Sequence, residues 1–269
     1  MHKFTLLMCI YAKENPVFLT QCIKSVMNQT VIPDEWIIVK DGPLTNELEA
    51  VLSNITYPGI IKQIALPQNV TLGPARAIGV EEANNDWIAI MDCDDICRHD
   101  RFEKQLAMIG FNPDFGLIGG QIAEFIEDPG HVIAKRNVPT EQIDIIKYAK
   151  RRNPYNHMTV MFKRELAIQV GNYRYFPGFE DYDLWTRMMR NGVICANHPD
   201  ILVDARVGSG VYGRRRGVSY IKSEWRMQKQ LKKLGITNAM EFMRNCAVRI
   251  PVRLLPERAL EAAYNRYAR

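Results

Sequence analysis

The sequence predicts an α/β protein in which a mostly parallel central sheet is flanked by helices. Short apolar runs alternate along the first half of the chain with segments whose apolar residues have helical spacing. Continuous apolar runs are typical of parallel strands, because helices cover both faces of such a sheet. With 269 residues, of which 47% are hydrophobic and 24% charged, the chain has enough material for one large domain.

The first two strands are separated by a helix with clear start signals. Residues 4–10 (FTLLMCI) predict a buried strand. Asn15 can then cap a helix that has Pro16 at its first position, and the apolar residues that follow have helical spacing. Residues 36–39 (WIIV) predict the second strand, which ends at the sequence KDGP.

Two further strands complete this half. A short helix is predicted at residues 47–52 and a third strand at 60–66 (IIKQIAL). The sequence TLGP leads into a helix that carries Arg76, and residues 87–91 (WIAIM) form the fourth strand. Ligands of parallel α/β sheets bind beyond the carboxyl ends of the strands, so those ends are where a site is expected.

Polar side chains stand at three of these strand ends, namely Tyr11, Asp41 and the acids Asp92, Asp94 and Asp95. Neighbouring strand ends bring them toward one crevice. An aromatic ring and a lone carboxylate there can stack on a base and bond its polar edge, while clustered carboxylates are hard ligands suited to magnesium or manganese. The acids can alternatively serve only to cap a helix that begins near residue 100.

Several classes of protein fit the sequence poorly. The turn after the first strand reads YAKENP instead of G-x-G-x-x-G, which argues against a dinucleotide cofactor. No apolar run approaches the roughly 20 residues of a membrane-spanning helix, and the N-terminus has no cleavage site, so a cytoplasmic chain is expected. The six scattered cysteines predict packing residues, and neither a disulfide framework nor a zinc site.

The charge is distributed unevenly. The whole chain carries +5, but residues 205–269 contain 15 Lys and Arg against 4 Asp and Glu, or +11, which leaves −6 on residues 1–204. Such a basic region suits nucleic acid, anionic lipid or a phosphorylated ligand. The segment 249–269 adds a helical apolar stripe beside arginines, which fits either an anionic membrane surface, with the protein peripheral on the inner face of the cytoplasmic membrane, or a terminal helix packed on the domain.

Several motifs, in order, resemble one enzyme family. They are the opening strand with Tyr11 and the sequences SVMNQT, LGPARAIGV, MDCDDICRHDRFEKQ and FEDYDLWTRM. Together they resemble the inverting nucleotide-sugar glycosyltransferases of family 2, and the likeness covers roughly residues 4–230. It is strongest to bacterial enzymes that build O-antigen, capsule or exopolysaccharide units, including the amylovoran-type transferases.

The resemblance implies a GT-A fold, with a Rossmann-like, mostly parallel sheet. Residues 1–235 would form the glycosyltransferase domain, whose nucleotide-sugar half spans 1–110 and whose acceptor half spans 111–235. Residues 236–269 would form a basic, amphipathic helical tail.

The resemblance also implies a nucleotide site. Tyr11 and Asp41 would contact the uracil of a UDP-sugar, and the backbone near Cys9 would belong to the same pocket. Arg76 would approach the diphosphate or the base, and Asp94 would meet the ribose or a metal. The chain departs from the common pattern at Lys40, where many members have aspartate, and at Ala12, where many have asparagine. The change at Lys40 bears on which nucleotide the site binds.

A divalent cation, Mn²⁺ or Mg²⁺, is the expected cofactor. By resemblance Asp95 or Asp94 would ligate it, and spacing does not separate the two. Transfer of a sugar from a nucleotide diphosphate expels a leaving group of growing negative charge, which such a cation stabilises. Asp92 is the weaker candidate and can act simply by shaping the turn.

The sequence PGFEDYDLWTRMMR supplies the candidate catalytic base. The spacing predicts a helix that begins at Glu180 and Asp181 near the far edge of the sheet. By resemblance Asp181 is the base that removes a proton from the acceptor hydroxyl, and Glu180 assists acceptor binding. The alternative is that both acids only complement the helix dipole.

Basic and imidazole side chains complete the predicted site. His157 precedes an expected strand on the acceptor side, where it would hydrogen bond the acceptor or the diphosphate, although a lone histidine can equally be structural. Arg206 and the glycine-flanked loop 210–217 would close over the diphosphate, with Arg214 and Arg215 as the contacting residues. A solvated basic loop is the alternative.

These observations predict a metal-dependent inverting glycosyltransferase that moves a hexose from a UDP-sugar to a hydroxyl of a growing, lipid-linked or oligosaccharide acceptor. A nucleotidyltransferase on a related sheet is the second hypothesis, but it calls for a glycine-rich phosphate loop that the sequence lacks. The third is a nucleic-acid-binding protein that uses the basic C-terminal region, which leaves the acidic cluster and Asp181 unexplained. Nucleic acid is therefore not expected as a partner.

Overall fold

The computed structural model describes residues 2–208 and 216–255. Its first four strands are parallel and lie in the order β3-β2-β1-β4. Each agrees with its predicted range to within one residue at either end. Their bounds are Phe4–Ile10 for β1, Glu35–Lys40 for β2, Ile60–Ala65 for β3 and Trp87–Ile90 for β4.

Helices cover both faces of this parallel half. On one face lie α1 (Pro16–Met27), α2 (Asn46–Ser53) and α4 (Arg101–Phe111), and on the other lies α3 (Leu72–Glu82). Leu6 and Met8 of β1 pack toward the first group, whereas Leu7 between them packs toward α3. Because both faces are buried, the strand sequence is apolar throughout.

The predicted start of the first helix is confirmed. The side chain of Asn15 accepts a hydrogen bond from the backbone N–H of Val17 at 2.8 Å, and Pro16 occupies the first helical position. The cap fixes where the chain turns after β1, so the segment with Tyr11 stays at the carboxyl end of the sheet.

The second half adds mixed strands to the same sheet. The short strand β8 (Met161–Lys163) pairs antiparallel with β4 and with β6 (Phe115–Phe125). Strand β9 (Ile194–Arg206) runs parallel to β6, and β5 (Ile96–Cys97) and β7 (Ala134–Arg136) are antiparallel edge partners. The resulting order is β3-β2-β1-β4-β8-β6-β9-β5.

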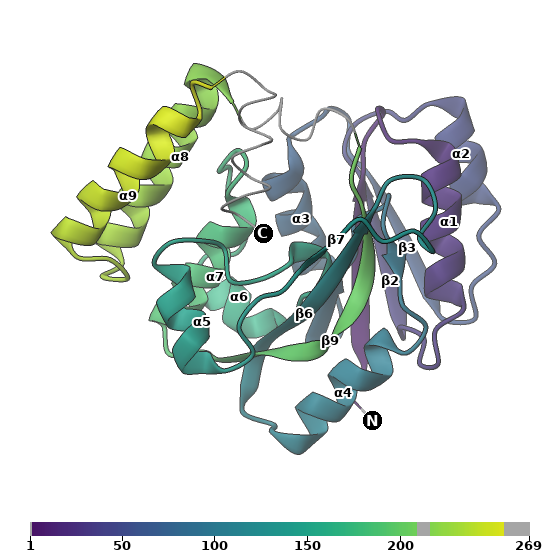
Figure 1. Ribbon diagram of the computed structural model, residues 1–269. Coiled ribbons are helices and arrows are strands. Elements are labelled where there is room, and N and C mark those ends of the chain that lie inside the picture. The colour runs from purple at the N-terminus through teal and green to yellow at the C-terminus, as the bar shows by residue number, and fades with distance from the viewer. Residues whose placement is uncertain (1, 209–215, 256–269) are drawn as a thin grey trace.

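Further helices pack on the face that α3 occupies. They are α5 (Gln142–Ala149), α6 (Arg164–Gln169) and α7 (Glu180–Arg190), with the 3-10 turn η1 (His157–Thr159) just before β8. Trp185 of α7 is fully buried against Tyr155 and Phe162. This core packs α7 on β8, which lies in the middle of the strand order. Figure 1 shows α7 beside α6.

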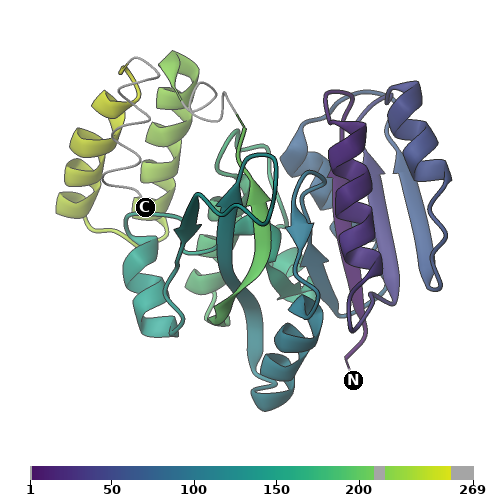
Figure 2. The ribbon, with the colours of Figure 1, turned by 45° about the vertical axis from the view of Figure 1, so that its right-hand side comes forward.

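Two final helices form a hairpin at one side of the molecule. They are α8 (Gly217–Lys233) and α9 (Ala239–Val252). Met227 and Leu231 of α8 pack on Tyr182 of α7 and on Phe179, the residue before α7, and α9 packs on α8. Figures 1 and 2 show the hairpin on the side opposite α1 and α2. Of the helices that the structure describes, none combines the length and the hydropathy needed to cross a bilayer.

Candidate functional site

Arg76 contacts both predicted acidic segments, the one that follows β4 and the one that begins α7. Its side chain is 5% exposed, and its Nη2 lies 2.9 Å from Asp92 Oδ1. Its Nη1 lies 3.6 Å from Glu180 Oε1. Burial lowers the pKa of Arg76, but Asp92, with Tyr173 and Glu180, raises that pKa more, so the guanidinium stays charged. Asp92 thus orients a buried cation, a role that the turn sequence alone did not indicate.

Asp181 is held rigidly in the first turn of α7. Its Oδ1 accepts a hydrogen bond from the backbone N–H of Tyr182 at 2.7 Å, and its Oδ2 accepts one from Asn153 Nδ2 at 2.5 Å. Burial raises the pKa of Asp181, although these hydrogen bonds and Arg76 oppose the shift. Burial also raises the pKa of Glu180. A carboxylate with a raised pKa is a stronger base than an exposed aspartate.

The position of α7 corrects one expectation. The acids were expected near the far edge of the sheet, whereas Glu180 lies beside Arg76 and Asp92, over the middle strands. The cause is strand β8, which inserts between β4 and β6 and folds the second half of the chain back against the first. The structure therefore brings Asp92, Arg76, Glu180 and Asp181 into one cluster.

His157 lies close to Asp181, just before strand β8 as predicted. Its Nδ1 is 3.9 Å from Asp181 Oδ2, which is too long for a hydrogen bond. Neither ring nitrogen has a hydrogen-bond partner among the described residues. The ring stacks on Trp185, with 6.1 Å between centroids. Burial lowers the pKa of His157 well below its usual value, so the imidazole is neutral and polar but unpaired.

Asp41 is buried at the end of β2 and holds the loop that leads to α3. Its Oδ1 accepts from the backbone N–H of Val70 at 2.7 Å, and its Oδ2 accepts from Asn69 Nδ2 at 3.0 Å. Gly42 permits this approach, since a Cβ there would lie 2.8 Å from the Asn69 nitrogen. Each carboxylate oxygen keeps further acceptor capacity. Tyr11 is half-buried at the neighbouring strand end.

Cys9 lies between these groups on β1. Burial raises the pKa of its thiol to about 12, and the charges that act on it are those of Arg76, Asp92 and Asp41. The thiol is therefore protonated at neutral pH, which argues against a nucleophile and is consistent with a residue that lines a pocket.

Asp94 and Asp95 form the tight turn after β4. Asp95 is 2% exposed, and its Oδ1 accepts a hydrogen bond from the backbone N–H of Arg206 at 2.7 Å. Burial, followed by the charges of Asp94 and Asp92, raises the pKa of Asp95 well above its usual value. Three carboxylates are thus crowded together, and of these Asp92 pairs with Arg76.

Asp94 and Asp95 fit a divalent cation only if other ligands, such as the phosphates of a bound substrate, complete its coordination shell. No group of three His, Cys, Asp or Glu side chains poised to hold a metal occurs within residues 2–208 and 216–255. Asp94 is half-exposed, whereas Asp95 is buried and already accepts one hydrogen bond. Neighbouring carboxylates suit a cation such as Mg²⁺, which takes one or two carboxylates and completes its shell with phosphate oxygens and water.

Arg206 holds the turn together instead of projecting from a loop. Its Nε donates to the backbone oxygen of Asp94 at 3.1 Å, and its Nη2 donates to Gln21 Oε1 at 2.5 Å. The guanidinium also lies 3.9 Å from the ring centroid of Phe18 and 4.5 Å from that of Phe125. Arg206 therefore ties the end of β9 to α1 and to the 94–95 turn. Arg214 and Arg215 lie outside the described residues.

Sequence reasoning missed three partners of the predicted residues. Asn153 hydrogen bonds Asp181, Tyr173 packs its ring on His157 and lies 5.9 Å from the Arg76 guanidinium carbon, and Gln21 receives Arg206. Asn153 stands four residues before the predicted residue His157, in the stretch NPYNH. Tyr173 and Gln21 carry no motif and become visible only in three dimensions.

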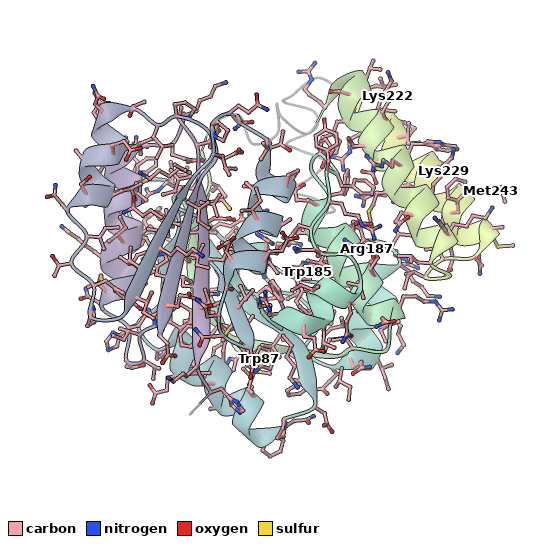
Figure 3. All side chains as sticks on the ribbon, turned by 180° about the vertical axis from the view of Figure 1, so that it is seen from behind. Trp87, Trp185, Arg187, Lys222, Lys229 and Met243 are labelled. Atoms are coloured by element: carbon pink, nitrogen blue, oxygen red, sulfur yellow. The ribbon has the colours of Figure 1, made fainter. Side chains whose placement is uncertain are left out.

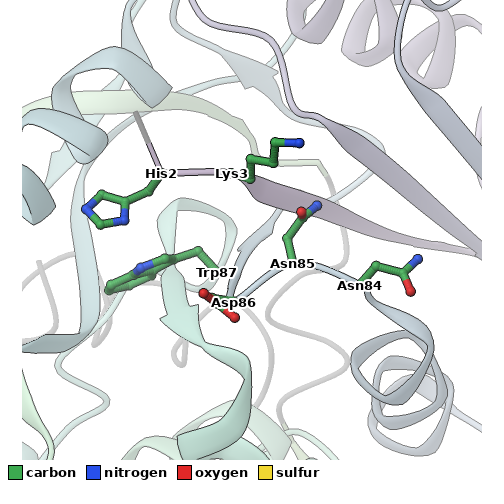
Figure 4. A pocket seen from close by; sticks show the side chains of 6 residues that line it. All are labelled: His2, Lys3, Asn84, Asn85, Asp86 and Trp87. Atoms are coloured by element: carbon green, nitrogen blue, oxygen red, sulfur yellow. The ribbon is translucent and has the colours of Figure 1, made fainter.

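A separate hollow lies at the opposite end of the strands (Figure 4). It is lined by His2, Lys3, Asn84, Asn85, Asp86 and Trp87, which flank the amino ends of β1 and β4. None of the predicted site residues lines it. Parallel sheets bind ligands at their carboxyl ends, so the crevice around Arg76 is the stronger candidate.

Comparison with known proteins places the chain within a family. The sequence pattern of Glycosyl transferase family 2 matches residues 5–171. That range includes Arg76 and the acids at 92–95, whereas Glu180 and Asp181 follow it.

Relatives match over almost the full length. An uncharacterised glycosyltransferase of Haemophilus influenzae is 43% identical over 99% of both chains. The amylovoran biosynthesis glycosyltransferase AmsE of Erwinia amylovora is 36% identical over 98% of both. A UDP-Gal:alpha-D-GlcNAc-diphosphoundecaprenol beta-1,3-galactosyltransferase of Escherichia coli is 36% identical over 94% of this chain and 92% of its own. The likeness to bacterial polysaccharide enzymes that the motifs indicated is confirmed.

Solved structures share the fold. The mannosyltransferase PcManGT of Pyrobaculum calidifontis, in complex with GDP-Man and Mn²⁺, superposes with a TM-score of 0.66 at 15% identity, over 99% of this chain and 76% of its own. TarS 1-349 of S. aureus, in complex with UDP-GlcNAc, gives a TM-score of 0.67 at 14% identity with the same coverage. At this identity the likeness establishes the fold, and the GT-A prediction is confirmed.

Proposed function

The chain belongs to glycosyl transferase family 2, and on this premise we propose that it moves a hexose from a UDP-sugar to a hydroxyl of a growing, lipid-linked bacterial surface glycan. The transfer inverts the configuration at the sugar carbon and depends on a divalent cation. The observation that carries the proposal is the crevice in which buried Arg76 pairs with Asp92 and Glu180 while Asp181, next in the chain, is held as a base.

Both substrates are proposed from the relatives and the neighbours. The Escherichia coli relative acts on UDP-Gal and on a GlcNAc-diphosphoundecaprenol acceptor by its name, and the TarS complex contains UDP-GlcNAc. UDP-galactose is therefore the first donor to test, and a diphosphoundecaprenol-linked N-acetylglucosamine is the first acceptor. The closely matched relative AmsE, named for amylovoran biosynthesis, supports the assignment to surface polysaccharide.

Asp94 and Asp95 are the residues that would hold the cation. Bound there with the donor diphosphate, Mn²⁺ or Mg²⁺ would neutralise the charge that develops on the leaving phosphate. The Mn²⁺ in the PcManGT complex supports the choice of cation class. Arg206 contributes indirectly, because it fixes the backbone of the turn that carries both carboxylates.

Asp181 is proposed to take the proton of the acceptor hydroxyl on its Oδ2. Asn153 and the Tyr182 N–H hold the carboxylate in one orientation, so it is positioned before the acceptor arrives. Its raised pKa makes it a better proton acceptor than an exposed aspartate. The reaction is then a single displacement, in which the hydroxyl attacks the sugar carbon from the face opposite the departing UDP.

The remaining residues are proposed to bind. Tyr11, Asp41 and the backbone at Cys9 form the base pocket, and Arg76 lies close enough to the crevice to approach the diphosphate. Glu180 and neutral His157 are proposed to lie on the acceptor side, with Glu180 assisting acceptor binding. For Arg214 and Arg215 the sequence prediction of a diphosphate contact stands.

A donor panel tests this function. We expect UDP-galactose, or another UDP-hexose, to bind the purified protein in the presence of Mn²⁺ or Mg²⁺ and to be hydrolysed slowly without acceptor, while a chelator abolishes both. Isothermal titration and UDP release would measure the two effects. GDP-mannose serves as the matched control. Failure of every UDP-sugar to bind with either metal would overturn the proposal.

A further inference from the structure

The hairpin of α8 and α9 has its polar side chains inside. Glu224 of α8 is fully buried, and its carboxylate accepts hydrogen bonds from Arg249 Nε at 2.5 Å and from Arg253 Nη2 at 2.9 Å. Asn245 and Gln228 are also buried and bond each other at 3.1 Å. A surface helix normally buries its apolar stripe and exposes its charges. The outward face of α9 is therefore left with apolar residues.

That outward face is an apolar stripe at helical spacing. Arg244 carries the only charge among the exposed side chains of residues 239–254. Large exposed apolar patches mark interaction sites, whereas isolated apolar residues do not. The stripe consists of Met240 (76% exposed), Met243 (62%), Ala247, Val248 (63%), Pro251 and Leu254 (66%).

The neighbouring helix α8 presents a basic face beside the stripe. Trp225, 40% exposed, lies where the helices meet, with its ring centroid 5.2 Å from that of Phe242. Across residues 216–255 there are nine Lys and Arg against two Asp and Glu, a net charge of +7. Figure 3 shows Lys222, Lys229 and Met243 together on this outer rim. The exposed basic residues of α8 are Lys222, Arg226, Lys229, Lys232 and Lys233.

We propose that this outer surface of the hairpin docks the protein on an anionic membrane. The apolar stripe of α9 enters the boundary between headgroups and acyl chains, and the cations of α8 contact lipid phosphates. Trp225 lies between the two, at the level that tryptophan prefers in bilayers. Charge complementarity selects a membrane over a second copy of this chain, because two such faces would bring +7 against +7.

Docking would also position the acceptor, an inference that rests on the proposed lipid-linked substrate. Tyr220 of α8 packs on Phe179, with 5.3 Å between ring centroids, and Phe179 immediately precedes Glu180. The docking surface is thus connected through direct side-chain packing to the helix that carries Asp181. A hairpin seated on the bilayer fixes the height of the crevice above the lipid headgroups, where a diphosphate-linked sugar is presented.

Vesicle binding by the full-length protein tests the proposal. We expect the protein to sediment with vesicles of phosphatidylglycerol and phosphatidylethanolamine, and not with vesicles of phosphatidylcholine. Iodide quenching of tryptophan fluorescence should decrease on binding, since Trp36, Trp87 and Trp185 are at most 2% exposed and Trp225 supplies the accessible signal. Trp225→Phe should remove this change in quenching.

Variants separate the two parts of the surface. The double variant Met243→Asp with Val248→Asp should weaken vesicle binding at least about tenfold, because it places charge in the stripe. Lys229→Gln should weaken it roughly fivefold. The matched controls Phe111→Asp, at a site 92% exposed on α4, and Lys24→Gln on α1 should leave binding unchanged. UDP release from donor in the absence of vesicles should be the same in all four.

Three results would overturn the docking surface. They are equal binding to phosphatidylcholine vesicles, wild-type binding by the stripe variant, and a dimer in solution that the stripe variant converts to a monomer, which would assign the stripe to a second copy. Failure of the proposed function has a different signature. In that case UDP release would be missing in every variant, whatever the vesicles show.

Discussion

At the residue scale, Arg76 fixes the geometry of the site because one buried guanidinium reaches acids from two distant segments. Asp92 follows β4 and Glu180 opens α7, so the ion pairs set the distance between the two halves of the crevice. Asp181 is stabilised differently, by a backbone N–H and an amide, and no Lys or Arg among residues 2–208 and 216–255 forms an ion pair with it. This difference suits Arg76 to orientation and Asp181 to proton transfer.

The raised pKa of Asp181 predicts how stability depends on pH. At neutral pH the ionised carboxylate is buried at a cost that the unfolded chain does not carry, so this residue lowers the free energy of unfolding. The cost disappears as the pH falls through the raised pKa toward the ordinary value of 3.8. As the pH falls over this range, the wild type should therefore become more stable relative to Asp181→Asn.

Urea unfolding of both proteins at several pH values measures this difference. The comparison cancels titration of all other groups that the two proteins share. A relative stability that stays constant from neutral pH to the ordinary aspartate range, or that decreases, would show that the Asp181 pKa is not raised.

At the element scale, the site depends on the close approach of α3 and α7. Gly73 in the first turn of α3 makes that approach possible, because a Cβ there would lie 2.3 Å from the Arg174 backbone oxygen and 3.3 Å from Glu180 Cβ. Strand β8 also contributes, because its pairing with β4 places the second half of the chain, with α7, against the first half. The spacing between Arg76 and Glu180 follows from both contacts.

Gly73→Ala is predicted to separate these helices. The new methyl group meets backbone, which cannot rotate away, so we expect a loss of about 1–3 kcal/mol in the free energy of unfolding and a lower kcat. Gly110→Ala is the control, because its Cβ would meet no atom within 4 Å and helix α4 should gain about 0.5–1 kcal/mol. Thermal unfolding and UDP release measure both. Unchanged stability and kcat in Gly73→Ala would contradict a close-packed contact.

The sequence predicted the local elements well and the long-range pairings poorly. The parallel strands could be found because each is a short, largely apolar run, and the Asn15 cap and the acids at the start of α7 are local signals. The place of β8 beside β4 could not be found, because it depends on pairing between segments about 70 residues apart. The Asn153 contact to Asp181 and the enclosure of Arg206 were missed for the same reason.

At the scale of the whole molecule, the charge asymmetry and the fold agree. Residues 1–204 carry −6 and include the acidic crevice, whereas the basic hairpin of α8 and α9 lies at the side. An anionic surface would attract the hairpin and repel the remainder, so the protein would have one preferred orientation. The same hairpin packs on α7, so the proposed docking surface and the proposed base Asp181 belong to one packed unit.

The most direct test of the central claim compares donor binding with turnover in Asp181→Asn. With UDP-galactose, Mn²⁺ and vesicles that contain the lipid-linked acceptor, wild-type protein should release UDP as sugar is transferred. The variant should bind donor with the wild-type Kd while kcat falls by about 10²–10⁴. Full turnover in Asp181→Asn, or no transfer from any UDP-sugar by the wild type, would contradict the account.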